Sequence, residues 1–208
     1  MKKYILIFGS TSSIAQNFIK NYKKKYSFIN ISSKNSTNAD FKNFDYSDKN
    51  FIDLSKKINL KKIFCVINFC GYFSKKNEEK KSRFINYEIA KKIIDFSTLH
   101  FLKRKMRVIT ITSLDSVHAN TNDINYSLYK SLTSKYIKNM KLLYKNEKIQ
   151  FDDLQLGAIN TKMRKKNFKD GLDSSEISKL INFILSLDYI TTLKPIKIFP
   201  KQKTYLEY

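Results

Sequence analysis

Three residues of this chain, Ser113, Tyr126 and Lys130, have the types and the spacing needed for acid–base chemistry at a carbonyl group. Ser113 ends an apolar segment that we expect to be a strand, and Tyr126 follows thirteen residues later in an expected helix. Because residues i and i+4 share one helical face, the Tyr126 hydroxyl and the Lys130 ammonium can point into the same cavity. Such a set could protonate a carbonyl oxygen while a hydride reaches the carbonyl carbon.

The spacing alone is not selective, because the chain contains 13 tyrosines and 40 lysines and arginines. A lysine also follows four residues after Tyr72, Tyr87 and Tyr144, and the last two have a serine thirteen residues upstream. Ser131 and Tyr144 would lie on one helix about 20 Å apart, so they cannot converge. Ser74 with Tyr87 stays open by spacing, although this serine ends no expected strand and a charged run follows it.

Length and composition indicate a globular protein with one domain. The chain has 208 residues, of which 42% are hydrophobic, and we expect one domain over residues 1–208. The apolar run at residues 4–8 is too short for a signal peptide, and no stretch approaches the ~18 apolar residues of a membrane span. We therefore expect a cytoplasmic protein that is not membrane-bound, in which Cys65 and Cys70 are reduced thiols. No metal site is expected, because neither histidine has a partner at metal-binding spacing.

The formal net charge of +22 is large enough to raise the alternative of nucleic-acid or membrane-surface binding. The lysines are spread over nearly every segment, however, with no basic tail and no single basic amphipathic helix. We therefore interpret the charge as a lysine-rich surface and do not expect a nucleic-acid partner. The positive field would still favour an anionic substrate or cofactor.

Apolar runs alternate with amphipathic segments, which predicts a parallel sheet covered on both faces. Strands are expected at residues 4–8, 26–31, 63–68, 108–112, 149–155 and 196–199, with a weaker candidate at 39–44. Helices are expected at residues 13–23, 50–58, 82–99, 124–143 and 175–187. With right-handed crossovers, this order predicts a single α/β domain: a Rossmann-type, doubly wound parallel sheet of about seven strands.

Three of the four glycines follow expected strands, at the edge where open α/β sheets bind ligands. These glycines are Gly9, Gly71 and Gly157. The turn after Gly9 adds three hydroxyl groups near the N-terminus of the expected first helix, which suits an anion. They belong to Thr11, Ser12 and Ser13.

Taken in order, these motifs resemble those of the short-chain dehydrogenase/reductase family over about residues 4–200. The segment from Gly9 is similar to its glycine-rich turn, Asn68-Phe-Cys-Gly71 to its Asn-Asn-Ala-Gly motif, and residues 156–161 to its nicotinamide-lining segment. The resemblance implies four catalytic residues, which are Ser113, Tyr126, Lys130 and Asn86. It implies cofactor contacts from Gly9, Thr11, Ser12, Ser13, Ile14, Lys34, Asp45, Tyr46, Asn68, Cys70, Gly71, Tyr126, Lys130, Gly157, Ile159 and Thr161.

The activity implied by the resemblance is hydride transfer between a nicotinamide and a carbonyl or secondary alcohol, with Tyr126 as general acid and base. Lys130 would favour the phenolate and hold the ribose, Ser113 would orient the carbonyl, and Asn86 would support a water relay. NADP(H) is favoured over NAD(H), because the second expected strand is followed by Lys34 rather than by a carboxylate. The alternative for Lys34 is one more surface lysine.

Several positions depart from the family pattern. Ser13 and Ala15 replace glycines of the turn, Leu156 replaces a proline, and Phe69 and Cys70 replace Asn and Ala. A catalytically silent NADP-binding protein with a regulatory or scaffold role is therefore the alternative, although the intact catalytic set favours an enzyme.

The partners implied by the resemblance are a small carbonyl or alcohol substrate and further copies of the chain. A homodimer or homotetramer would form through the helices at residues 82–99 and 124–143. The substrate lid expected at about residues 163–175 is short. A short lid suits an open pocket and a substrate carried on a nucleotide or carrier-protein handle.

Overall fold

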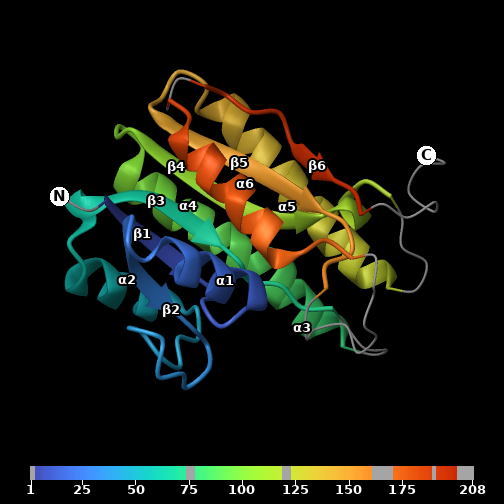
Figure 1. Ribbon diagram of the computed structural model, residues 1–208, viewed down its shortest axis with the longest axis horizontal. Helices are drawn as coiled ribbons and strands as arrows, with labels where there is room; N and C mark the ends of the chain where they lie inside the picture. Colours follow the sequence, from blue (N-terminus) through green and yellow to red (C-terminus); the bar gives the residue numbers. More distant parts are fainter. Residues whose placement is uncertain (1–2, 74–77, 119–122, 161–170, 189–190, 201–208) are drawn as a thin grey trace.

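A parallel sheet of six strands forms the centre of the fold, in the order β2-β1-β3-β4-β5-β6 (Figure 1). The computed structural model describes residues 3–73, 78–118, 123–160, 171–188 and 191–200. The strands are β1 (Lys3–Phe8), β2 (Tyr26–Ile31), β3 (Ile63–Asn68), β4 (Met106–Ser113), β5 (Ile149–Leu156) and β6 (Ile196–Ile198). The chain runs outward from β1 to β2 and then returns to β3, so the strand order reverses beside β1.

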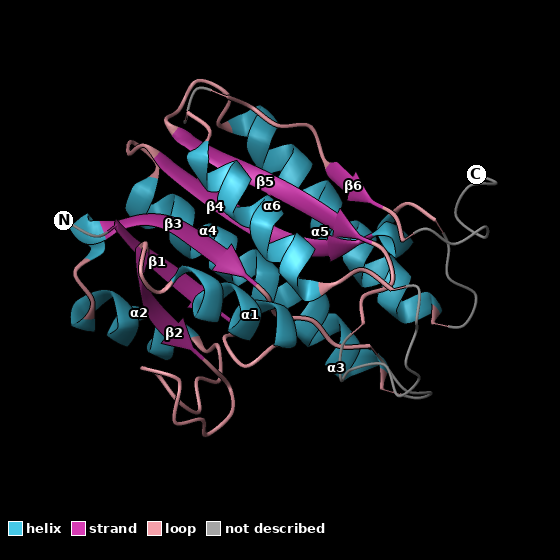
Figure 2. Cartoon of the chain, in the orientation of Figure 1, coloured by secondary structure: helices cyan, strands magenta, loops and turns pink. Residues whose placement is uncertain are grey.

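Helices cover both faces of this sheet, as Figure 2 shows. They are α1 (Ser13–Tyr22), α2 (Asp48–Lys57), α3 (Glu79–Arg83), α4 (Ile89–Phe101), α5 (Ile124–Leu143) and α6 (Ser174–Ser186). One core lies under α1 and α6, and the other lies under α2, α4 and α5. Because both faces are buried, β1 and β3 have nearly continuous apolar runs rather than alternating patterns.

The predicted α/β fold is confirmed, with six strands among the described residues rather than about seven. The weak candidate at residues 39–44 forms one parallel bridge, between Ile31 and Phe41. Asn43 and Tyr46 have φ angles of 51° and 61°, and this left-handed backbone cannot continue a strand. The predicted extended pattern was present, but the backbone turns away before a ladder can form.

The helix predicted at residues 82–99 is divided in the structure. It consists of α3, a π-helical segment (Phe84–Glu88) and α4. The helix predicted at residues 124–143 has the same bounds as α5. Within the described part of the chain, no helix is both long and apolar enough to cross a membrane. Cys65 and Cys70 are free thiols, and most of the predicted lid lies outside the described residues.

Candidate active site

Ser113, Tyr126 and Lys130 are placed around the carboxyl end of β4. Ser113 is the last residue of that strand, and the other two lie in the first two turns of α5. Lys130 is only 4% exposed, and its Nζ donates a 3.3 Å hydrogen bond to the main-chain oxygen of Ile111, two residues before Ser113. The same Nζ lies 5.8 Å from the centre of the Tyr126 ring. The fold therefore brings the tyrosine and the lysine to the strand end that carries the serine.

Burial and neighbouring groups set the charge of Lys130. Burial lowers the pKa of this lysine from its ordinary 10.5 to about 8, whereas Cys70 and Asp153 act in the opposite direction. A Cβ atom at Gly71 would lie 3.5 Å from Nζ, so the lysine also lies against the segment after β3. At neutral pH most Lys130 side chains are protonated, and a positive charge beside Tyr126 favours its ionised form.

Local contacts orient Ser113 and Tyr126. The Ser113 hydroxyl accepts a 3.2 Å hydrogen bond from the main-chain N–H of Asp115, and it can still donate its own hydrogen. Asp123 caps α5 by accepting a 2.9 Å bond from the main-chain N–H of Tyr126, which determines where the helix begins. The half-buried Tyr126 ring packs against Phe73, with 5.2 Å between ring centres. Phe73 is thus an aromatic neighbour of Tyr126 that sequence reasoning did not identify.

Asn86 lies in the π-helical segment and is almost fully buried. Its side chain holds both polar main-chain groups of Tyr72, through bonds of 3.0 Å from the N–H and 2.7 Å to the oxygen. It also donates to the Ser82 hydroxyl over 3.1 Å, and its main-chain oxygen accepts a 2.7 Å bond from Thr133. Asn86 therefore ties the segment after Gly71 to α5, and its role in a water relay stays a prediction.

The turn after β1 is built around Gly9. This residue has a φ of 73°, and a Cβ atom there would lie 2.8 Å from the main-chain nitrogen of Cys70. Ser12 caps α1, and its main-chain N–H donates a 3.0 Å bond to the oxygen of Gly9. The Ser10 hydroxyl is buried and has no hydrogen-bond partner among the described residues. A glycine cradle, a helix N-terminus and a spare hydroxyl fit the phosphates of a dinucleotide.

The segment after β2 lies beside this turn. The hydroxyls of Thr11 and Ser32 are 3.4 Å apart, and the main-chain N–H of Lys34 donates a 2.9 Å bond to the Ser32 hydroxyl. Lys34 is exposed. Ser13 and Ile14 form the first turn of α1, where Ile14 packs into the core under α1 and α6. The structure thus brings Lys34 next to the glycine turn, as its predicted contact with a phosphate requires.

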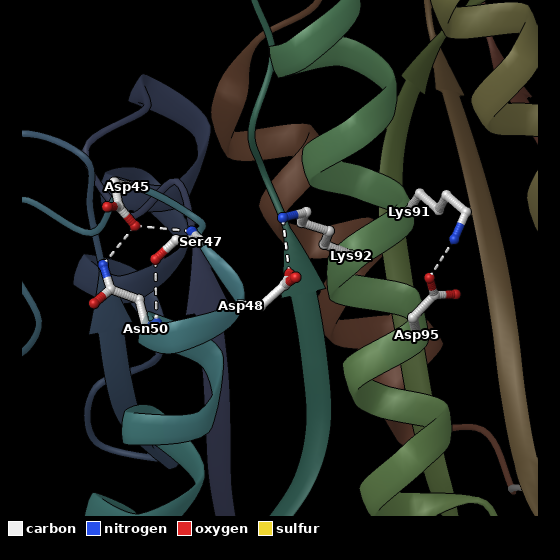
Figure 3. Close-up of polar contacts among 7 residues, drawn as sticks. All are labelled: Asp45, Ser47, Asp48, Asn50, Lys91, Lys92 and Asp95. Carbon is white, nitrogen blue, oxygen red and sulfur yellow. Dashed lines mark hydrogen bonds and ion pairs between the residues drawn. The ribbon is translucent and has the colours of Figure 1, made fainter.

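Asp45 and Tyr46 differ sharply in exposure. Asp45 is exposed, and its Oδ1 accepts bonds of 2.8 Å from the Ser47 N–H and 2.7 Å from Asn50 Nδ2 (Figure 3). These hydrogen bonds, led by that from the main chain of Ser47, hold the pKa of Asp45 below its usual value. Tyr46 is buried, with its hydroxyl 3.1 Å from Cys70 Sγ, and burial raises its pKa. A ligand above the turn could meet the main chain of Tyr46, but its ring packs in the core.

The segment after β3 is held by Asn68. This buried side chain accepts a 2.9 Å bond from the main-chain N–H of Cys70 and so shapes the path toward Gly71. Burial raises the pKa of the Cys70 thiol to about 11, against the opposing effects of the Tyr46 hydroxyl and Lys130. Cys70 is therefore a neutral thiol that packs beneath the glycine turn.

Gly157 follows β5 and is required by packing. A Cβ atom there would lie 2.5 Å from Cδ of Pro200, and its N–H donates a 2.9 Å bond to the main chain of β6. Ile159 forms a single parallel bridge with Leu172. Thr161 lies outside the described residues. The predicted nicotinamide-lining role of this segment stays a prediction.

The two alternative serine–tyrosine–lysine sets are not placed in this way. Tyr87 lies in the π-helical segment, and its Lys91 forms a 2.5 Å ion pair with Asp95 along the surface of α4 (Figure 3). The serine of that set lies outside the described residues. Ser131 lies inside α5, and Tyr144 immediately follows the last residue of that helix. The two residues are therefore held apart along a single helix, as predicted.

The structure also shows a buried polar group on β5 that sequence reasoning missed. Asp153 and Gln155 lie under α5 and are joined to Thr112 of β4. The available signal was the acidic pair Asp152-Asp153 within a segment otherwise predicted to be a buried strand. A carboxylate is rarely fully buried without a partner, so an acidic pair in a buried strand indicates that polar or charged partners lie nearby.

Comparison with known proteins shows similarity at the level of the fold. No protein-family model matches the sequence, and no curated protein is significantly similar to it. Among solved structures, ElxO with NADP bound has a TM-score of 0.82 and 17% identity, covering 95% of this chain and 97% of that chain. A short-chain dehydrogenase from Burkholderia cenocepacia in complex with NADP has a TM-score of 0.80 and 10% identity, covering 96% and 90%.

A third structure, the aldohexose dehydrogenase of Thermoplasma acidophilum, has a TM-score of 0.80 and 13% identity, covering 95% of this chain and 92% of that chain. The three alignments span nearly the whole of each protein. The chain therefore has the Rossmann-type fold of the short-chain dehydrogenases/reductases.

Proposed function

We propose that this chain is an NADP(H)-dependent oxidoreductase that interconverts a carbonyl group and a secondary alcohol. The observation that carries the proposal is the buried ammonium of Lys130, one helical turn from Tyr126 and against the segment after β3. Burying a lysine charge is unfavourable, and perturbed titratable groups of this kind are concentrated at functional sites. The fold supports the proposal, because two proteins that share it are complexes with NADP.

The proposed proton chemistry follows from the positions of the side chains. A bound nicotinamide would supply or accept the hydride. Tyr126 would donate a proton to the carbonyl oxygen, and the Lys130 charge would make that proton easier to release. Ser113 would donate its hydroxyl hydrogen to the same oxygen. Asn86 would keep the segment after Gly71 in position through its two bonds to Tyr72.

The test is NADPH oxidation with a panel of carbonyl compounds, including keto-sugars and 3-oxoacyl thioesters. Tyr126→Phe should lose about 10²–10⁴-fold in kcat while still binding NADPH, because only the proton donor is removed. Tyr144→Phe is the matched control and should keep full activity. Near-normal turnover of Tyr126→Phe would contradict the assignment, and NADPH binding without turnover of any compound would favour the silent binding protein.

The preference for NADP(H) is proposed from Lys34, which lies beside the glycine turn. Replacing this lysine with aspartate places a carboxylate where the 2′-phosphate of NADP would bind. A carboxylate repels that phosphate, but it can accept a hydrogen bond from the 2′-hydroxyl of NAD. Lys34→Asp should therefore raise KM for NADPH and lower KM for NADH. Lys42→Asp changes the charge by the same amount at another exposed position and should leave the ratio unchanged. An unaltered ratio in Lys34→Asp would remove this residue from the cofactor site.

Self-association through α4 and α5 is a further part of the proposal. Both helices expose apolar side chains, and the most exposed are Leu99, Ile124, Leu143 and Leu142. A dimer would cover such surface. Sedimentation measurements should find a dimer or tetramer, and a monomer at micromolar concentration would contradict it.

A substrate on a nucleotide or carrier-protein handle is tested by including both kinds of handle in the carbonyl panel.

A further inference from the structure

A buried polar group lies between β5 and α5. Side chains alternate along a strand, and Phe151 belongs to the core under α5 whereas Leu154 belongs to the core under α1 and α6. Asp153 and Gln155 therefore face α5. Asp153 is only 3% exposed, so its carboxylate is removed from water.

The hydrogen bonds of Asp153 connect it to the surroundings of Lys130. One carboxylate oxygen accepts the hydroxyl of Thr112, the residue after Ile111, whose main-chain oxygen binds Lys130 Nζ. The other oxygen accepts a 2.9 Å bond from Gln155 Nε2, which also donates over 3.4 Å to the Ser134 hydroxyl. Ser134 lies one helical turn after Lys130 on α5. Hydrogen bonds through Gln155 thus connect the carboxylate to the face of α5 that carries Lys130.

Buried charged groups lie on both faces of the sheet. On the α5 face, Asp153 acts on Lys130, and the partly buried Lys141 is influenced by Asp152 and Asp153 and, in the opposite direction, by Arg107. On the opposite face, Arg107 and Asp152 form a 2.8 Å ion pair that is itself buried. The Cys70 thiol, in the segment after β3, is the other group that acts on Lys130 from outside α5, and the ring of Tyr126 lies beside Lys130 on α5 itself.

Both donors to Asp153 are neutral groups, and a buried charge is retained when an opposite charge lies nearby. We propose that Asp153 is a positioning residue whose buried carboxylate is the counter-charge that keeps Lys130 in its ammonium form. The charge coupling stands on the contacts described above, whereas its consequence for catalysis rests on the proposed function. Removing the charge of Asp153 should lower the pKa of Lys130, because burial would then act with less opposition.

The matched test is Asp153→Asn in the cofactor-free full-length chain. The amide keeps an acceptor for Thr112, and Gln155 can turn its own amide to meet the new donor. Its Oε1 is buried and without a partner among the described residues. With ¹³C-labelled lysines, the Lys130 Cε signal is identified by its absence from Lys130→Met. Its titration midpoint in Asp153→Asn should fall by about one unit or more.

Asp152→Asn is the control, since it removes the adjacent buried carboxylate from the opposite face and should leave the Lys130 midpoint unchanged. An unchanged midpoint in Asp153→Asn would overturn the proposal. Should that variant not fold, Asp153→Ser replaces it, because serine also removes the charge and keeps a hydroxyl for hydrogen bonding. The Lys130 midpoint should again fall, and an unchanged midpoint would overturn the proposal.

Turnover separates this inference from the proposed function. For carbonyl reduction the protonated tyrosine–lysine pair is needed, so the alkaline limb of the pH profile should move to lower pH in Asp153→Asn. A lower titration midpoint of Lys130, together with an alkaline limb at lower pH, supports both proposals. A lower midpoint without any carbonyl turnover supports the counter-charge and contradicts the oxidoreductase.

Discussion

Replacing Lys130 with methionine should slow the proposed proton transfer, because the charge beside Tyr126 is lost, and at neutral pH it should stabilise the fold. The folded protein disfavours the lysine charge, because burial lowers the pKa from 10.5 to about 8. A difference of one pH unit corresponds to ~1.36 kcal/mol, so charging the buried lysine costs about 3 kcal/mol at pH 7. Methionine avoids that cost but gives up the bond to Ile111, worth about 1 kcal/mol. The expected net gain is about 2 kcal/mol.

The pH dependence gives the sign of this effect. Below pH 8 the folded lysine is charged, and its unfavourable burial is fully present. Between pH 8 and 10.5 the folded state has lost a proton that the unfolded state still binds, so the stability of the unaltered protein rises with pH. The advantage of Lys130→Met should therefore be close to zero at pH 10.

Urea unfolding of the cofactor-free protein at pH 7 and pH 10 measures both quantities. Lys138→Met, at an exposed position of α5, is the matched control and should show little change at either pH. The reasoning is refuted if Lys130→Met is less stable than the unaltered protein at pH 7, or if its advantage is the same at both pH values. A stabilised but inactive variant would mean that the lysine is kept for function at the expense of stability.

Three further substitutions test how the site is held together. Gly9→Ala should destabilise the fold by at least about 1–2 kcal/mol, because the left-handed backbone disfavours a side chain and the new Cβ would press on the main chain of Cys70; an unchanged urea midpoint would contradict this. Ser12→Ala removes the N-cap of α1 and should cost about 1 kcal/mol in the same assay, whereas no loss would mean that water replaces the cap. Asn86→Leu leaves the polar main-chain groups of Tyr72 without their buried partner and should cost about 2 kcal/mol or more. It should also raise KM for NADPH, and a KM equal to that of the unaltered protein would separate Asn86 from the cofactor segment.

Much of the fold could be predicted from local patterns. The helix predicted at residues 124–143 has the bounds of α5, and the buried strands β1 and β3 follow from short apolar runs. The candidate at residues 39–44 had a similar pattern, but Asn43 and Tyr46 adopt left-handed backbone that local propensity does not reveal. The π-helical segment was also missed, because the apolar spacing over residues 84–94 is compatible with one continuous helix.

The candidate site was predictable in its position and not in its electrostatics. Ser113, Tyr126 and Lys130 could be assigned to one sheet edge because the carboxyl ends of parallel strands share that edge. Asp153 could not be connected with Lys130, since their electrostatic interaction depends on which face of β5 packs against α5. The burial of Tyr46 was equally hidden, because a tyrosine in a turn is usually expected at the surface.

The amino-acid sequence by itself determined the order of strands and helices, the glycine turn and the spacing that puts Tyr126 and Lys130 on one helical face. These depend on interactions between residues close together in the chain, so local rules are sufficient. Only the tertiary structure decided the charge environment of Lys130, because desolvation and the approach of Asp153 depend on elements distant in sequence. The residue types state which chemistry is available, and the packing of β4, β5 and α5 sets the pH at which it can operate.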